Sequence, residues 1–218
     1  METLSIGVLA SGRGSNFQSI IDAIDSGYLR ANIVLLITDN PNAFAIERAR
    51  KHGIETLILE PKLSASRNAY YKKIARELKI REVGLVILAG FMRVVGKPLV
   101  DAFRFRIMNI HPALLPSFPG LHGQAQAVDY GVKISGCTVH FVDEGIDSGP
   151  IIIQAAVPAF FDDTEDILSE RILSLEHRIF PEAIRLFAEN RLEVVGRKVN
   201  IHGHSTEKSF LVSPHVSG

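Results

Sequence analysis

The chain has 218 residues, in which 24 lysines and arginines balance 24 aspartates and glutamates. This length fits one domain with a large core, or one domain and a short appendage. The neutral balance argues against a general nucleic-acid or membrane-surface binder, because such proteins carry a basic excess. It leaves room for a local basic pocket that holds one phosphate.

Simple features of the chain indicate its compartment. The opening stretch METLSIGVLA lacks the basic segment and long apolar run of a signal peptide, and no window approaches the roughly 18 apolar residues of a membrane span. The only cysteine, Cys137, lies in an apolar run, so no disulfide framework forms and the thiol is expected to be a small core residue. These features predict a soluble, cytoplasmic protein.

Apolar runs alternate with amphipathic segments through the first half of the chain. Strands are expected at 4–10, 32–38, 56–59 and 85–89, and helices at 17–24, 43–52 and 66–80. Ser15 or Asn16 is placed to cap the first helix, and Gly53 to end the second. This order predicts an α/β fold with a doubly wound, mostly parallel sheet and right-handed crossovers.

The second half changes character. After a short strand around 107–110 and a helix at 122–131, two β-rich runs at 133–142 and 150–157 predict a hairpin that adds antiparallel strands. A long helix follows, with Asp162 or Asp163 as its cap and Pro181 expected to interrupt or kink it.

From Arg197 onward the periodicity is lost, so 197–218 is expected to be a frayed tail. His202 and His204 have no partners spaced for a metal site.

The turn SGRGSN (11–16) follows the first strand and opens the first helix. Exposed amides at a helix start suit a phosphate, although many strand–helix turns use Gly and Ser for geometry alone. The turn lacks the third glycine of the dinucleotide fingerprint and the Gly-Lys-Ser/Thr of a Walker A loop.

A second polar group gathers in NIHPALLPSFPG (109–120) and HFVDEGIDSGP (140–150). Asn109 and His111 are two positions apart, so they face the same side of an extended strand, and a Gly-punctuated loop adds Asp147. An amide, an imidazole and a carboxylate on converging segments are suited to general acid–base chemistry at a carbonyl centre. Each residue alone is also typical of an ordinary turn or strand end.

A third candidate segment is GFMRVVGKPL (90–99), after the fourth strand. Phe91 and Met92 beside Arg93 either line a pocket for a flat aromatic ligand or pack beneath the next helix. The sequence alone leaves both readings open.

Taken together, SGRGSN, NIHP with LLPSFPG, and HFVDEGIDSGP resemble the phosphoribosylglycinamide formyltransferase family in order and spacing, from the start to about Val195. The resemblance implies transfer of a formyl group from 10-formyltetrahydrofolate, as co-substrate, to the amine of glycinamide ribonucleotide in purine biosynthesis. It implies no metal, no nucleic-acid or membrane partner, and a monomer or homodimer. It also divides a catalytic domain, 1–196, into a phosphate-binding half (1–105) and a catalytic, folate-binding half (106–196).

The resemblance also assigns residues. It implies Asn109, His111 and Asp147 as catalytic residues. For the amine substrate it implies Gly12, Gly14, Ser15, Asn16 and Glu176. For folate it implies Arg67, Phe91, Met92, Arg93, Val94, Val95, Val142, Asp143, Glu144 and Gly145. One departure is Gln124, where the family often has His, so neither it nor His122 receives a firm role.

Three alternatives remain. A methionyl-tRNA formyltransferase is expected to carry a further tRNA-binding domain, and this neutral chain offers no surface for a polyanion the size of tRNA. A formyltetrahydrofolate deformylase has a second His directly after the catalytic one, where this chain has Pro112, and a regulatory domain before the first strand. A non-catalytic phosphate-binding module would use the SGRGSN turn and show no turnover.

Overall fold

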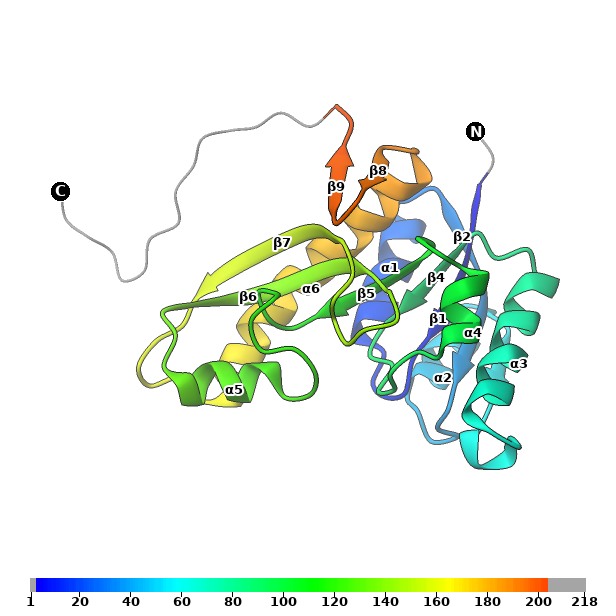
Figure 1. Ribbon diagram of the computed structural model, residues 1–218, viewed down its shortest axis with the longest axis horizontal. Helices are drawn as coiled ribbons and strands as arrows, with labels where there is room; N and C mark the ends of the chain where they lie inside the picture. The colour runs from blue at the N-terminus through cyan, green and yellow to red at the C-terminus, as the bar shows by residue number, and fades with distance from the viewer. Residues whose placement is uncertain (1–2, 204–218) are drawn as a thin grey trace.

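One mixed sheet runs through the computed structural model, which describes residues 3–203 (Figure 1). Its strands within that range are β1 (Leu4–Leu9), β2 (Ala31–Thr38), β3 (Thr56–Ile58), β4 (Leu85–Leu88), β5 (Ile107–His111), β6 (Ile134–Phe141), β7 (Ile151–Pro158), β8 (Leu192–Val195) and β9 (Lys198–Ile201). The helices are α1 (Ser15–Asp25), α2 (Ala45–Lys51), α3 (Arg67–Ile80), α4 (Lys97–Ala102), α5 (Gly123–Tyr130) and α6 (Glu165–Ala188), with a 3-10 turn, η1, at Pro61–Leu63.

The strand order is β3-β2-β1-β4-β5-β6-β7-β9-β8. The first five strands in this order are parallel, and β6 and β7 add antiparallel neighbours. The chain winds outward from β1 in one direction and from β4 in the other, which confirms the doubly wound prediction and creates a switch point between β1 and β4, where such sheets bind ligands.

Helices cover both faces of the sheet. One core cluster joins the strands to α1, α2 and α6, and a second joins them to α3 and α4. Because both faces are covered, β1, β2 and β4 are nearly continuous apolar runs, which is why the sequence predicted them. The predicted helix at 66–80 is also confirmed, and the Ser66 hydroxyl caps it by accepting from the Ala69 amide at 3.1 Å.

The start of α1 differs from the prediction. Gly14, in a left-handed conformation with φ 66°, is the N-cap residue, and no side chain caps the helix. Ser15 and Asn16 were therefore wrong as caps. Both residues lie inside the first turn, and the Asn16 side chain bonds a partner far along the chain instead. The first amides of α1 consequently have no side-chain cap.

The expected cap of α6 is wrong, and the expected interruption at Pro181 does not occur. Thr164 is its N-cap and accepts from the Ile167 amide at 3.3 Å, whereas Asp163 pairs with Arg171 at 2.7 Å. The helix runs without interruption through Pro181. Pro181 is buried with its neighbours against the sheet, and this packing offsets the roughly 3 kcal/mol that an interior proline costs.

The expectation of a frayed tail is wrong for residues 197–203, and residues 204–218 lie outside the described part of the chain. Val195 and Lys198 are joined by a tight turn with Gly196 at φ 61°, and β9 pairs with β8 and with the edge of β7. His202 lies beside Glu193 at 3.2 Å on the surface, and His204 lies outside the described residues. Short, half-exposed strands of this kind carry little periodicity, so the sequence pattern missed them.

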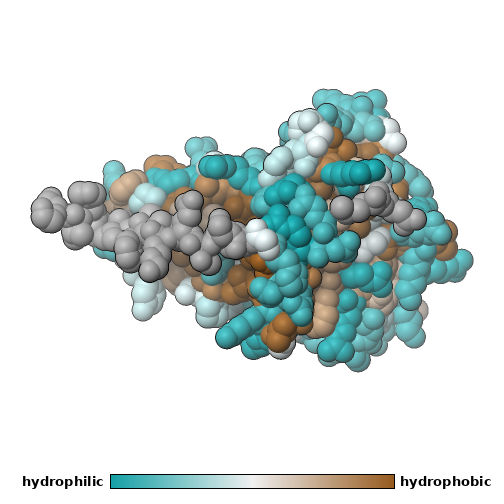
Figure 2. All heavy atoms as spheres, turned by 90° about the horizontal axis from the view of Figure 1, so that it is seen from above, coloured by the Kyte–Doolittle hydropathy of each residue, from teal (hydrophilic) through white to brown (hydrophobic). Residues whose placement is uncertain are grey.

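Hydrophilic and hydrophobic residues are unevenly distributed over the surface of the molecule (Figure 2). Seen from above, hydrophilic residues dominate the right-hand part of the molecule, where α3 lies, and hydrophobic residues show between them toward the middle (Figure 2). Among the helices between residues 3 and 203, none is long and apolar enough to cross a membrane.

Candidate active site

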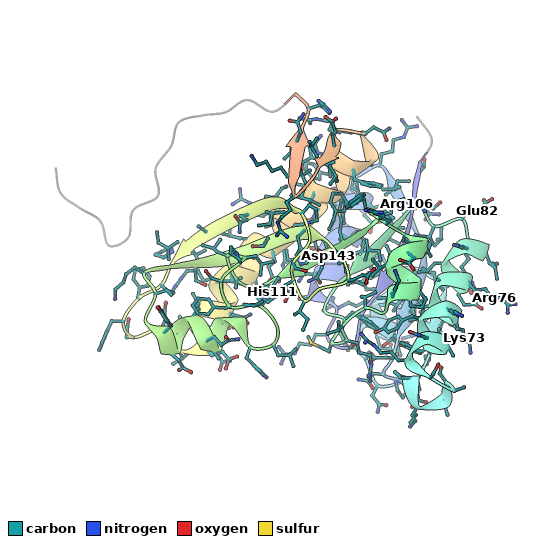
Figure 3. The ribbon with its side chains drawn as sticks, in the orientation of Figure 1. Lys73, Arg76, Glu82, Arg106, His111 and Asp143 are labelled. Carbon is teal, nitrogen blue, oxygen red and sulfur yellow. The ribbon has the colours of Figure 1, made fainter. Side chains whose placement is uncertain are left out.

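The candidate catalytic residues meet where β5 ends. Asn109 and His111 lie on this strand, which is antiparallel to β6. Figure 3 shows His111 beside the loop after β6, the loop that carries Asp143 and Asp147. The Asp147 carboxylate lies 3.4 Å from His111 Nδ1 and 3.4 Å from Asn109 Nδ2. The structure thus brings together the three residues that the sequence singled out.

Asp147 is held as a carboxylate. Burial raises its pKa, but hydrogen bonding by His140, the amide of Gly120 and the nearby imidazole of His111 outweigh burial and leave the pKa below its ordinary value. The Gly120 amide donates to Asp147 Oδ2 at 2.8 Å. Asp147 itself adopts φ 49°, a left-handed conformation that Asp tolerates better than most residues. This turn directs its carboxylate toward β5.

Both ring nitrogens of His111 face oxygen acceptors. Nδ1 faces Asp147, and Nε2 lies 2.8 Å from the carbonyl oxygen of Phe118. A doubly protonated imidazole can donate to both acceptors. The segment Phe118–Gly120 therefore occupies hydrogen-bonding positions on both groups, with its carbonyl on His111 and its amide on Asp147.

A buried polar contact positions this proline-rich loop. The Thr138 hydroxyl donates to the Ala113 carbonyl at 2.7 Å and accepts from the Leu115 amide at 3.1 Å. Gln154 donates to the Leu115 carbonyl at 2.9 Å and to Thr138 at 3.0 Å. Strands β6 and β7 thus hold the loop that covers His111.

His140 is a site residue to which the sequence analysis gave no role. It lies directly opposite Asn109 in the β5–β6 register and is only 2% exposed. Its Nε2 lies 3.2 Å from Asn109 Nδ2 and 3.6 Å from Asp147 Oδ1, while Nδ1 faces the Phe141 carbonyl at 2.8 Å. The available signal was a single histidine in the apolar run CTVHFV, but the register that places it opposite Asn109 follows only from the fold.

The SGRGSN turn lies at the switch point. Ser11 at the end of β1 accepts from the Met92 amide at 3.0 Å, which joins this turn to the segment after β4. The carbonyl of Gly12 accepts from the Ala45 amide at 3.1 Å. A Cβ at Gly14 would come within 2.9 Å of the Ala45 side chain. The turn therefore requires glycine for both its φ angle and its packing.

A buried pair connects this turn to α6. Asn16 Nδ2 donates to Glu176 Oε2 at 2.8 Å, and both side chains are buried. Burial raises the pKa of Glu176, and the Asn16 hydrogen bond offsets this only in part. Asn16 Oδ1 is buried with no hydrogen-bond partner among residues 3–203. Such an unpaired acceptor is unfavourable in an empty site and suits a ligand that donates to it.

The residues implied for folate binding divide into two groups. Met92, which is 66% exposed, and Val94 lie at the surface, whereas Phe91 and Val95 pack in the core with α3 and α4. Phe91 and Val95 therefore contribute to the core beside α3 and α4, and the contact of this segment with folate stays a prediction.

The charged residues implied for folate binding form hydrogen bonds or ion pairs within the protein, and the remaining ones shape or pack beside the same loop. Arg67 donates to the Val94 carbonyl at 2.9 Å, and Arg93 pairs with Asp39. Glu144 pairs with Lys97 at 2.9 Å. Asp143 accepts from the Gly145 amide at 3.1 Å and from the Ser148 hydroxyl, which shapes the turn, and Val142 packs beside the core formed with α3 and α4.

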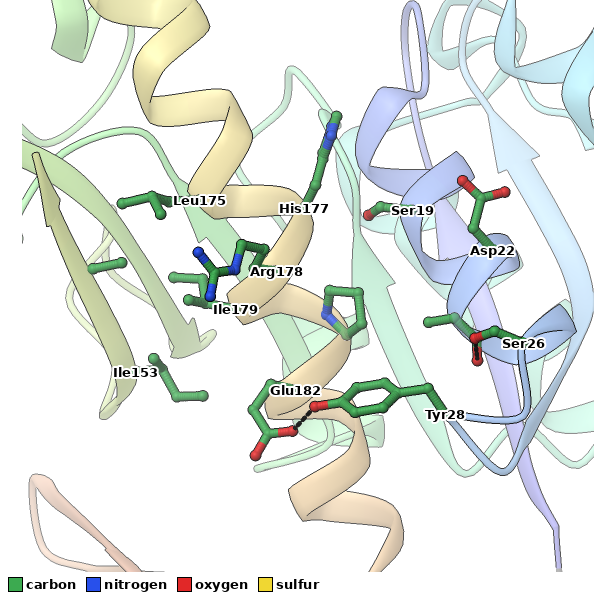
Figure 4. Close-up of a pocket in the computed structure, with 13 residues that line it drawn as sticks. Ser19, Asp22, Ser26, Tyr28, Ile153, Leu175, His177, Arg178, Ile179 and Glu182 are labelled. Atoms are coloured by element: carbon green, nitrogen blue, oxygen red, sulfur yellow. Dashed lines mark hydrogen bonds between the residues drawn. The ribbon is translucent and has the colours of Figure 1, made fainter.

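A separate cavity of about 810 Å³ lies between α1, α6 and β7. Figure 4 shows Asp22 and Tyr28 facing Glu182 and His177 across it, with the Tyr28 hydroxyl donating to Glu182. Its lining does not include the catalytic candidates on β5 or Asp147. It carries charges of both signs that partly satisfy one another, so it does not define a ligand class.

The remaining metal-ligating and nucleophilic side chains between residues 3 and 203 bear on whether the chain has a metal site or a reactive thiol. Within this range no group of three or more His, Cys, Asp and Glu residues is arranged to hold a metal ion. Cys137 is buried in β6, and burial raises its pKa to about 12. The thiol therefore stays protonated at neutral pH.

Fold and site together define a class of protein: a doubly wound α/β enzyme with an amide–imidazole–carboxylate cluster beside a glycine turn at the switch point. The formyl transferase family matches residues 4–184. The chain belongs to the formyl transferase family.

Individual relatives agree with this assignment. The chain is 41% identical over 191 residues to phosphoribosylglycinamide formyltransferase of Escherichia coli, covering 88% of this chain and 90% of the relative. It is 50% identical over 183 residues to the trifunctional purine biosynthetic protein adenosine-3 of Drosophila melanogaster, but spans only 14% of that longer protein and 83% of its own length. The crystal structure of glycinamide ribonucleotide transformylase 1 from Symbiobacterium toebii superposes with a TM-score of 0.90 at 51% identity, covering 91% of this chain and 94% of that one.

Proposed function

We propose that this chain transfers a formyl group from 10-formyltetrahydrofolate to the primary amine of glycinamide ribonucleotide, a step of purine biosynthesis. The observation that carries the proposal is the Asn109–His111–Asp147 cluster, which lies at the carboxyl edge of the sheet near an uncapped, glycine-rich helix start. The family membership and the names of the relatives support the same reaction.

The chemistry follows from the geometry. The substrate amine attacks the formyl carbon, and negative charge develops on the formyl oxygen. Asn109 Nδ2 and an N–H of His111 donate to that oxygen, each well-placed donor contributing on the order of 3 kcal/mol. The Phe118 carbonyl occupies the acceptor position at His111 Nε2, and the formyl oxygen replaces it as a chemically similar acceptor.

The proton must then move from the attacking amine to the departing nitrogen. Asp147, ionised because its pKa is lowered, accepts hydrogen bonds from its neighbours and stabilises the charged imidazole. It assists proton transfer to the nitrogen of the folate, directly or through water. Collapse of the tetrahedral intermediate breaks the bond to that nitrogen and releases tetrahydrofolate. The step requires no covalent enzyme intermediate.

The rest of the amine substrate fits the other groups of the switch point. The free amides at the start of α1 suit its phosphate, since the helix dipole favours an anion there. Asn16 Oδ1 and Glu176 suit donors such as the ribose hydroxyls, which would satisfy the buried acceptor. We expect the exposed Met92 and Val94, together with Asp143 and Glu144 of the loop after β6, to contact the folate.

The test mixes the purified chain with glycinamide ribonucleotide and 10-formyltetrahydrofolate and measures both formylated amine and free formate. We expect formylated amine in a one-to-one ratio with the donor consumed, and no consumption without the amine. Release of formate without the amine would identify a deformylase instead. Phosphate binding without any turnover would identify a binding module.

A further inference from the structure

Helix α2 holds the glycine turn SGRGSN (11–16) from one side. The Ala45 amide, at the start of α2, donates to the Gly12 carbonyl at 3.1 Å. Nearly one helical turn further along, Arg48 Nε donates to the Arg13 carbonyl at 2.9 Å. Two successive carbonyls of the turn are therefore bonded to the same helix.

These two contacts decide where the amides of the turn point. A trans peptide unit is planar, so its carbonyl and its N–H point in opposite directions. Because the carbonyls of Gly12 and Arg13 face α2, the amides of Arg13 and Gly14 face away from it, and neither amide donates to an acceptor among residues 3–203. The next amides open α1 without a side-chain cap. Successive N–H groups in such a turn form a concave site for an anion.

A second observation marks this turn as a ligand site. Asn16 is only 9% exposed, and its Oδ1 has no hydrogen-bond partner among residues 3–203. The turn thus offers amide donors to an anion and, close by, a buried acceptor to a hydroxyl group. A phosphorylated sugar carries both kinds of group.

The side chain of Arg48 bridges three segments. Besides the Arg13 carbonyl, it reaches the first turn of α1, where Nη1 donates to Gln18 Oε1 at 2.9 Å. Its guanidinium also lies 5.1 Å from the centre of the Phe44 ring. Arg50 on the same helix pairs with Glu47 at 2.8 Å, whereas both of these Arg48 hydrogen bonds go to uncharged oxygens. Arg48 therefore serves the position of the turn rather than a surface ion pair.

We propose that Arg48 is a positioning residue for the phosphate of the amine substrate. By holding the Arg13 carbonyl, it keeps the Gly14 amide turned toward the anion. The inference rests on the proposed function, which supplies glycinamide ribonucleotide as the ligand of the turn. Because Arg48 acts through the backbone, the hydrogen bond from its Nε matters more than its charge.

The variants separate the hydrogen bond from the charge. Arg48→Met places a methyl carbon at the position of Nε and removes both. Arg48→Gln removes the charge, but its amide nitrogen is as many bonds from the backbone as Nε, so it can still donate to the Arg13 carbonyl. The matched control, Arg50→Met, removes one positive charge from the same helix.

The experiment compares glycinamide ribonucleotide with glycinamide riboside, which lacks the phosphate. We expect Arg48→Met to lower kcat/KM about tenfold for the ribonucleotide, the scale of one charge-assisted hydrogen bond, and less than twofold for the riboside. The kcat for the ribonucleotide and the KM for the folate donor should stay within about twofold. Arg48→Gln should recover most of the loss, and Arg50→Met should match the starting protein. Thermal melts check that each variant is folded.

An equal loss with both amines would mean that Arg48 only stabilises the fold, and would overturn the inference. A loss that Arg48→Gln does not recover would assign the effect to charge and would also overturn it. Titration with ribose 5-phosphate measures binding without turnover. Absence of turnover in the starting protein would contradict the proposed function. Binding of ribose 5-phosphate that weakens in Arg48→Met and returns in Arg48→Gln would still uphold the inference, and equal binding by all three proteins would overturn it.

Discussion

At the scale of single residues, His111 and Asp147 face each other at 3.4 Å and are proposed to act as a unit. Asp147→Asn keeps the size of the side chain but removes the charge that stabilises the protonated imidazole. We expect kcat to fall by roughly two orders of magnitude with little change in either KM, measured by steady-state kinetics. The double variant His111→Ala/Asp147→Asn should be hardly slower than the slower single variant. Multiplicative losses would mean that the two residues act independently.

The second prediction concerns Glu176 and the dependence of thermal stability on pH. Its pKa is raised by burial, so the folded protein holds the proton after the unfolded chain has lost it. Stability from this group is therefore complete below the ordinary value of 4.5 and is lost as the pH rises through the raised folded value. Glu176→Gln keeps an acceptor for Asn16 without ionising. We expect its Tm relative to the starting protein to increase from pH 5 to pH 8, measured by thermal melts. A constant difference across this range would show that Glu176 has no raised pKa.

At the scale of elements, the first turn of α1 depends on Gly14. Gly14→Ala forces a Cβ against Ala45 and disturbs the amides proposed to bind phosphate. We expect the KM for glycinamide ribonucleotide to rise at least tenfold while the folate KM changes less than threefold. The matched control is Gly27→Ala, because Gly27 also has a left-handed φ, of 77°, but open space around it. A similar KM change in the control, or equal changes for both substrates, would count against a phosphate role.

The elements also show what a sequence can predict. The strands β1, β2 and β4 were predictable because both of their faces are buried, which leaves a continuous apolar run. The hairpin β8–β9 was not, because its short strands are half exposed and bind the sheet only at its edge. The helix α4, six residues long, has too few turns to show a period.

The site was predictable to the extent that its residues are neighbours in sequence. Asn109 and His111 share one strand, and the loop signal placed Asp147 nearby. The place of His140 depends on strand register, and the Asn16–Glu176 contact joins residues 160 positions apart. The contact of the Phe118 carbonyl with His111 involves backbone, which no side-chain pattern records.

At the scale of the whole molecule, Cys137 reports on global unfolding. It is the only cysteine in the chain, is fully buried in β6, and its pKa is raised to about 12. We expect a thiol reagent to label it only when the central sheet opens, so the labelling rate at neutral pH should follow the global unfolding rate measured by circular dichroism. Denatured protein, as the control, should label at the rate of a free thiol. Fast labelling under native conditions would reveal local opening around β6.

The contact between Asn16 and Glu176 can form only late in the synthesis of the chain, because the two residues are 160 positions apart. A ribosome adds residues at roughly 5–20 per second, so about 10–30 s pass between the synthesis of Asn16 and that of its partner 160 positions later. During that interval the glycine turn can already exist, but the acceptor pair for the amine substrate cannot. Binding of that substrate therefore distinguishes a finished molecule from a growing one, because a chain that ends before α6 lacks half of the pair.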